Sequence, residues 1–210
     1  MRRTTMALAL AISMLPATSA LAHPPVTVLR SFDPMMGQLP ESITADDSGN
    51  LYFSMGGTLQ KYTTDHQLVT VATIPVPVMQ GAATLGVKVG PDGFIYMATA
   101  AFAPNLSTAF VWKISPAGQV TQFADLNQPG AIPNDLVFDP AGNLYVTDSG
   151  LGQIYKIDPQ GQVAVWFNHP LLLGDPSNPV AGNPLGANGI AFAPLGCHLY
   201  VANSDFGRIV

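Results

Sequence analysis

A short unit recurs four times along the chain, and it limits the possible folds more than any other feature of the sequence. Each copy has an apolar segment, a turn containing Gly, and a second apolar segment with one tyrosine: Tyr52, Tyr96, Tyr145 and Tyr200. The tyrosines are separated by 44, 49 and 55 residues. A loose repeat of this length is typical of a propeller in which each repeat forms one four-stranded blade.

A second hairpin completes the first three copies. Its paired strands are expected at residues 59–62 with 69–71, 111–114 with 120–123, and 154–157 with 163–166. Turns rich in Gly and Pro separate these strands. No segment beyond the amino-terminal one has a helical apolar period. The sequence therefore predicts an all-β protein, a β-propeller of four-stranded antiparallel blades.

The fourth copy is shorter than the others, because residues 207–210 read as the opening of its third strand and the sequence stops there. We expect about three and a half to four blades. Since a propeller protects its strand edges by closing into a ring, we also expect a piece of a longer protein, or one that needs a partner to close. A closed ring of four blades is the alternative, and it would leave the last blade half built.

The first 22 residues have the pattern of a secretory signal peptide. Arg2 and Arg3 precede an apolar stretch over residues 6–15, and Ala20 and Ala22 form a small-x-small cleavage site. The apolar stretch breaks at Pro16, well short of the roughly 20 residues that span a bilayer, which disfavours a membrane anchor. We predict cleavage after Ala22, a propeller domain over residues 23–210, no membrane span after cleavage, and a periplasmic or secreted location.

Composition excludes several classes of function. Only 10% of residues are charged and the net charge is -5, so nucleic acid is not an expected partner. The single cysteine, Cys197, cannot form an internal disulfide. The four histidines share no position in the repeat, which disfavours zinc. Neither a Gly-x-Ser-x-Gly elbow nor a phosphate-binding glycine loop is present in the sequence.

Polar side chains recur at the start of the innermost strand of each repeat. Counting back 11 residues from the tyrosine, or 12 in the last copy, gives Glu41, Leu85, Asn134 and Asn188. Innermost strands of a propeller begin near one mouth of the central channel, so these side chains should converge. One carboxylate and two amide oxygens suit calcium better than zinc. Alternatively, the asparagines only start turns.

The segments Pro40-Glu41-Ser42-Ile43, Pro133-Asn134-Asp135 and Ala187-Asn188-Gly189-Ile190 resemble the SMP-30/gluconolactonase/LRE family of six-bladed propellers. The resemblance covers roughly residues 28 to 210. It implies that Glu41, Asn134 and Asn188 bind Ca²⁺ or another divalent cation, and that the substrate is a lactone or related ester. It also implies a further Asp ligand, the usual candidate for the base or nucleophile, which is expected beyond Val210. The catalytic residue is therefore unknown, and we expect this chain alone to bind the metal weakly and to hydrolyse nothing.

Two other functional classes remain open at this point. One is a non-catalytic propeller of the NHL type that binds a ligand or a protein. The other is a propeller similar to strictosidine synthase, which would catalyse condensation.

Several further residues have two interpretations. Asp135 either starts a strand by binding backbone N–H groups, which is the favoured reading, or binds a second calcium. Asp148 and Ser149 are read as turn residues outside the site. Trp112 and Trp166 are expected to pack between blades. The loops 168–186 and 100–108 are candidates for a lid or a specificity loop.

Overall fold

The structure is a computed structural model that describes residues 26–103, 105–177, 183–194 and 198–210. The chain divides into two units, one ending at Ser31 and one running from Phe32 to Val210. All strands belong to the second unit. The predicted signal peptide, residues 1–22, and Cys197 lie outside the described residues. Within the described ranges, no helix has both the length and the apolar character needed to cross a membrane.

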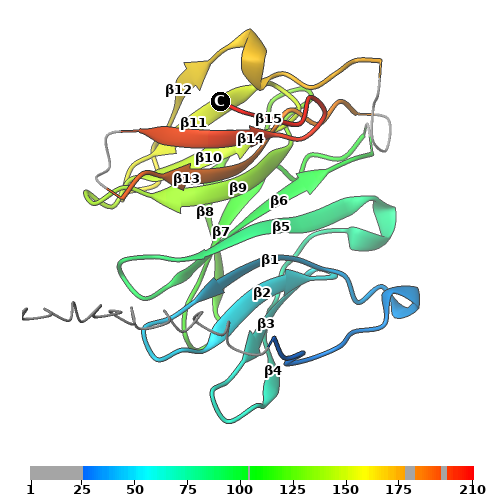
Figure 1. Cartoon of the computed structure of the whole chain (residues 1–210), viewed down its shortest axis with the longest axis vertical. Helices are drawn as coiled ribbons and strands as arrows, with labels where there is room; N and C mark the ends of the chain where they lie inside the picture. Colours follow the sequence, from blue (N-terminus) through cyan, green and yellow to red (C-terminus); the bar gives the residue numbers. More distant parts are fainter. Residues whose placement is uncertain (1–25, 104, 178–182, 195–197) are drawn as a thin grey trace, which may run out of the picture. The chain divides into compact units, whose positions relative to one another are not determined.

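The second unit is built from antiparallel sheets that follow one another along the chain (Figure 1). The first sheet contains β1 (Pro40–Ala45), β2 (Leu51–Met55), β3 (Thr58–Tyr62) and β4 (Leu68–Thr73). The second contains β5 (Ala82–Val89), β6 (Ile95–Ala101), β7 (Phe110–Ile114) and β8 (Val120–Asp125). The third contains β9 (Pro133–Phe138), β10 (Leu144–Asp148), β11 (Gln153–Ile157) and β12 (Val163–Asn168). The fourth contains β13 (Ala187–Phe192), β14 (Leu199–Asn203) and β15 (Arg208–Ile209).

This arrangement confirms the predicted β-propeller class and the position of every predicted hairpin. Strand order in each sheet follows chain order, so every blade is a simple meander. In the described residues, three blades have four strands and the last has three. The helices described are short 3-10 turns: η1 (Pro34–Met36), η2 (Val78–Gln80) and η3 (Pro170–Leu172).

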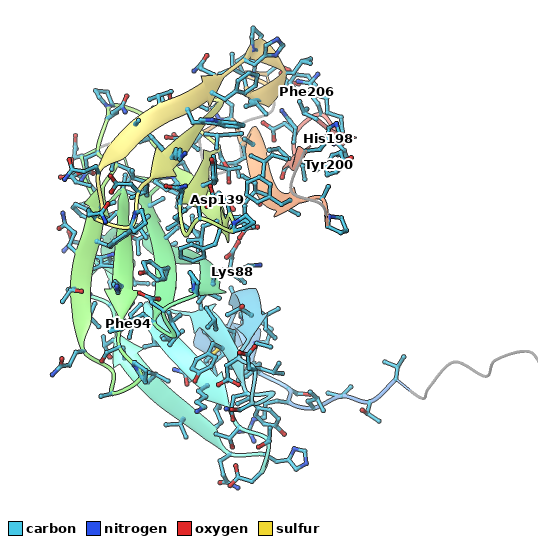
Figure 2. The ribbon with its side chains drawn as sticks, turned by 90° about the vertical axis from the view of Figure 1, so that its left-hand side faces the viewer. Lys88, Phe94, Asp139, His198, Tyr200 and Phe206 are labelled. Atoms are coloured by element: carbon cyan, nitrogen blue, oxygen red, sulfur yellow. The ribbon has the colours of Figure 1, made fainter. Side chains whose placement is uncertain are left out.

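The repeat tyrosine ties the second strand of a blade to its own turn. Tyr52 donates to Asp46 (3.2 Å), and Tyr96 donates to Asp92 (2.9 Å). Tyr145 makes the same bond in the third blade. These rings are buried, whereas Tyr200 in the fourth blade is 49% exposed and stacks beside His198 (Figure 2). The tyrosine therefore recurs because it closes the inner hairpin and fills the face that meets the next blade.

Apolar side chains from neighbouring blades form the core. The cluster between the first two blades includes Leu59, Met97 and Trp112, and the cluster between the second and third includes Val111 and Leu136. Burial of this kind is the main favourable contribution to folding. Trp112 is 8% exposed, as predicted.

The prediction for Trp166 is wrong, because this side chain is 48% exposed on β12. Its ring packs edge-on against Tyr145 within its own blade, with 5.1 Å between the ring centroids. β12 is the outermost strand of the third blade, and all of its residues are exposed.

Candidate functional site

Each innermost strand contains a β-bulge at the positions that the repeat register selects. In β1 the pairing passes from Pro40 opposite Met55 to Ile43 opposite Phe53, so that two residues of β1 face only Ser54. Such a bulge re-aims side chains and is common beside functional sites. The bulged pairs in the four blades are Glu41–Ser42, Leu85–Gly86, Asn134–Asp135 and Asn188–Gly189. The candidate ligands therefore occupy one structural position in three different blades, at the end of the sheets that we call the bulge end.

Glu41 lies in surroundings that oppose its negative charge. The residue retains an exposed surface, yet nearby protein atoms desolvate its carboxylate and raise the pKa to about 7, and the charge of Asp135 raises it further in the same direction. In the described part of the chain, no hydrogen bond to the Glu41 carboxylate is found. A cation beside this group would offset both effects.

Asn134 is almost completely buried, with 6% of its surface exposed. Within the described residues its side-chain amide has no hydrogen-bond partner. Buried amides are nearly always paired, so an unpaired one calls for a ligand, an ion or a water.

Asn188 has a defined amide orientation. Its Nδ2 donates to Ser204 Oγ at 2.8 Å, which leaves Oδ1 as the available acceptor. Its backbone carbonyl accepts a bond from Thr147 Oγ1 at 2.6 Å. The side-chain oxygen of Asn188 is thus free to serve as a neutral ligand.

Asp135 links two blades through backbone N–H groups. Its Oδ1 accepts from Leu136 N (2.8 Å) and its Oδ2 accepts from Ile190 N (3.1 Å) in the next blade. Ser42 holds the equivalent position in the first blade, where its Oγ accepts from Val87 N at 3.1 Å. The favoured interpretation of Asp135, binding to backbone N–H groups, is confirmed by these contacts.

The second blade carries an apolar pair at its bulge. Leu85 packs with Ala100 and Ile132 in a small buried cluster. A Cβ placed on Gly86 would lie 2.5 Å from the Asn134 carbonyl oxygen and 2.7 Å from Asp135 Cα. Glycine at this position therefore lets the second and third blades approach closely at the bulge that carries Asn134.

The end of β10 holds both asparagine-bearing strands in place. Thr147 Oγ1 accepts from Asp135 N (3.0 Å) and donates to the Asn188 carbonyl. Ser149 Oγ donates to the carbonyl of Ala187. Each of these bonds fixes the backbone next to a candidate ligand.

Asp148 adds a buried carboxylate to the same segment. Its Oδ1 accepts from the backbone N–H of Ile132 (2.9 Å), and its Oδ2 accepts from Tyr155 Oη (2.9 Å). Desolvation raises its pKa. The sequence analysis placed Asp148 and Ser149 in a turn outside the site, and this is wrong, because they end a buried strand and position the start of β9 and β13. The Thr-Asp-Ser order after an apolar strand was the only sequence signal for this role.

The donor set fits a hard divalent cation. No group of three or more His, Cys, Asp or Glu able to hold a metal occurs in the described ranges, so a cation here would depend on the mixed set of one carboxylate and two amide oxygens. Oxygen ligands of these types are those that Ca²⁺ prefers. Among the described residues no hydrogen bond joins Glu41, Asn134 and Asn188 to one another, which leaves their oxygens available.

Comparison with known proteins gives a consistent result. The profile of the family described as the SMP-30/Gluconolactonase/LRE-like region matches residues 39–210. A gluconolactonase from Zymomonas mobilis is 27% identical over 150 residues, which cover 63% of this chain and 36% of that protein.

Among solved structures, a virginiamycin B lyase from Staphylococcus aureus has a TM-score of 0.61 at 18% identity, covering 81% of this chain and 50% of that one. A gluconolactonase from Xanthomonas campestris has a TM-score of 0.57 at 13% identity, covering 78% and 54%. These two structural similarities show the fold alone. The chain spans about a third of the Zymomonas relative and about half of each solved structure.

Proposed function

The chain belongs to the SMP-30/Gluconolactonase/LRE-like family, and from this premise we propose that the protein is a calcium-dependent hydrolase of lactones or related esters. Because the chain spans only part of its relatives, the proposal concerns the whole protein of which these residues form the amino-terminal blades. The similarity to a gluconolactonase supports a small-molecule substrate.

One observation carries the proposal: three oxygen-bearing side chains occupy the same bulge position in three blades, and two of them have no protein partner among the described residues. Leaving a buried amide unpaired costs about 1–3 kcal/mol. A site that accepts this cost in the same place where a carboxylate is desolvated is organised for a cation rather than for its own stability.

The residues have different tasks in this site. Glu41 would supply the negative charge, and its pKa of about 7 would fall when a cation binds. Asn134 and Asn188 would supply neutral oxygens without adding repulsion. A bound divalent cation would polarise the ester carbonyl and stabilise the oxyanion that develops on it. We assign no general base to the described residues.

The location of the protein is a second part of the proposal. We infer from Arg2, Arg3 and the small-x-small site at Ala20 to Ala22 that the chain is exported to the periplasm or beyond. Amino-terminal sequencing of the protein purified from the cell envelope would give His23 as the first residue if this is right.

A lactone panel tests the function directly. The full-length protein is assayed with and without a chelator, alongside Asn188→Ala and a control, Asn168→Ala, in which an exposed asparagine on β12 is removed. Hydrolysis that depends on added calcium, is lost in Asn188→Ala and is kept in Asn168→Ala is the expected result. Hydrolysis that neither the chelator nor Asn188→Ala affects would exclude the calcium mechanism.

A further inference from the structure

A cavity of about 630 Å³ lies at the bulge end, between the second and third blades. Three connections form its walls: residues 102–109 between β6 and β7, residues 126–132 between β8 and β9, and Asn183 before β13. The start of β5 pairs with the end of β6, and the start of β9 pairs with the end of β10, so these connections lie at the same end as the bulges. The volume is in the range of small-molecule sites.

The lining is polar but uncharged. None of the described residues that form the walls carries a charge; they combine apolar groups such as Phe102, Leu106 and Ile132 with the amides and hydroxyls of Thr108, Asn127 and Gln128. A cavity with this lining has no counter-ion for a phosphate or carboxylate. It suits a neutral compound with hydroxyl or carbonyl groups on an apolar frame.

Thr108 supplies an unused hydrogen-bonding group in this wall. The residue is 7% exposed, and its Oγ1 is buried without a hydrogen-bond partner in the described part of the chain. Its own backbone carbonyl is engaged, since it accepts from Thr99 Oγ1 at 2.8 Å. A buried hydroxyl without a partner is unfavourable for folding, so its retention points to a ligand that pairs with it.

The polar walls are held in place before any ligand arrives. Asn127 Oδ1 accepts from Ala109 N (3.0 Å), and its Nδ2 donates to Asp125 Oδ1 (2.8 Å). Asn183 Nδ2 donates to the Phe102 carbonyl at 3.3 Å, which joins the two loops that the sequence analysis named as candidate specificity loops. A site organised in this way loses little entropy on binding.

The cavity and the candidate cation site share one frame. Ile132 lines the cavity, lies two residues before Asn134 and packs against Leu85 at the bulge of the second blade. The Ile132 N–H is bound by Asp148, whose neighbour Thr147 binds the carbonyl of Asn188. A molecule in the cavity is therefore positioned relative to the same backbone that carries the ligands.

We propose that this cavity binds the uncharged, hydroxylated ring of the substrate, with Thr108 as a specificity-determining residue. This inference rests on the proposed function, because it assigns the substrate class of the same site. It selects neutral hydroxylated lactones and excludes those that carry a phosphate or a carboxylate on the ring.

Binding without chemistry provides the first test. The probe is 1,5-anhydroglucitol, a neutral ring that cannot be hydrolysed, titrated calorimetrically into chelator-treated protein. Thr108→Val removes the hydroxyl at nearly constant volume. Thr84→Val is the matched control, since Thr84 Oγ1 is also buried without a partner in the described residues but does not line the cavity.

The expected result is saturable binding that Thr108→Val weakens about three- to tenfold, the range for one lost hydrogen bond, while Thr84→Val leaves it unchanged. The 6-phosphate of the same ring should not bind. Absence of saturable binding to the wild type, equal affinities of the two variants, or tighter binding of the phosphate would each overturn the inference.

Kinetics of the full-length protein separate this inference from the proposed function. With a neutral lactone, Thr108→Val should raise KM and keep kcat, since it changes binding of a part that does not react. If the ring binds as expected but no lactone is hydrolysed, the proposed function fails and the cavity assignment stands. If calcium-dependent hydrolysis occurs and Thr108→Val matches Thr84→Val in KM, the cavity assignment fails alone.

Discussion

Replacement of Gly86 by alanine tests how closely the second and third blades approach. The added Cβ would meet the Asn134 carbonyl oxygen at 2.5 Å, Asp135 Cα at 2.7 Å and Asp135 Oδ1 at 3.0 Å. The two shorter contacts are with backbone and cannot be relieved by a side-chain rotation. The blades must therefore separate at the bulge, and overpacking of this kind costs about 1–3 kcal/mol.

Gly189 provides the matched control, because it holds the same bulge position in the fourth blade. A Cβ there would have only ordinary contacts, at 3.9 Å from Asp135 Oδ2 and 4.0 Å from Ala202 Cβ. Gly189→Ala should be neutral or should stabilise the protein by about 0.4–1 kcal/mol through the unfolded chain. The two variants should then differ in the free energy of unfolding by on the order of 2 kcal/mol.

Thermal unfolding followed by circular dichroism measures this difference. At about 2–4 °C per kcal/mol for a domain of this size, the melting temperature of Gly86→Ala should lie roughly 4–8 °C below that of Gly189→Ala. Calcium affinity should also fall in Gly86→Ala, since the displaced backbone carries Asn134. Equal melting temperatures for the two variants would refute the close-approach argument.

Three further outcomes are expected. Thr147→Val should lower stability by about 1–3 kcal/mol, by leaving backbone groups unpaired, and weaken calcium binding, whereas Thr147→Ser should retain most of both; equal loss in the two, by denaturant titration and calorimetry, would contradict the positioning role. In chelator, Glu41→Gln should gain stability over wild type as pH rises from the ordinary pKa of 4.5 through about 7, because a raised folded-state pKa gives stability at low pH that is lost on ionisation; a pH-independent difference in melting temperature would contradict this. Tyr96→Phe should lose about 0.5–1.5 kcal/mol, the worth of one hydrogen bond, and the exposed Tyr200→Phe should lose none, as measured by urea unfolding.

The fold could be predicted from the sequence because its repeat is local. Each turn glycine and each tyrosine marks the same step of one hairpin, and the Tyr–Asp hydrogen bonds explain why the two recur together. The position of the candidate ligands followed from the same register. The bulge that reorients Glu41 and Asn134 was not predicted, since an extra strand residue leaves no mark on an apolar pattern.

The supporting contacts of the site could not be predicted because they join distant parts of the chain. Thr147 and Ser149 bind strand β13 about 40 residues later, and nothing near them in the sequence names that partner. The cavity is formed by irregular connections, which have no periodicity to interpret. Trp166 was misjudged because its burial depends on what lies beside the outer strand β12, which local sequence does not encode.

Calcium titration is the most direct test of the central claim that Glu41, Asn134 and Asn188 form one cation site. The chelator-treated chain is titrated by isothermal calorimetry, as wild type, as the three single alanine variants and as the exposed control Asn168→Ala. The account predicts one binding event for wild type and the control, with a dissociation constant in the weak range of about 10⁻⁴–10⁻³ M, and at least about tenfold weaker binding when any one ligand is lost, equivalent to 1.4 kcal/mol. Calcium binding that is the same in all five proteins, or no calcium binding by the wild type, would contradict it.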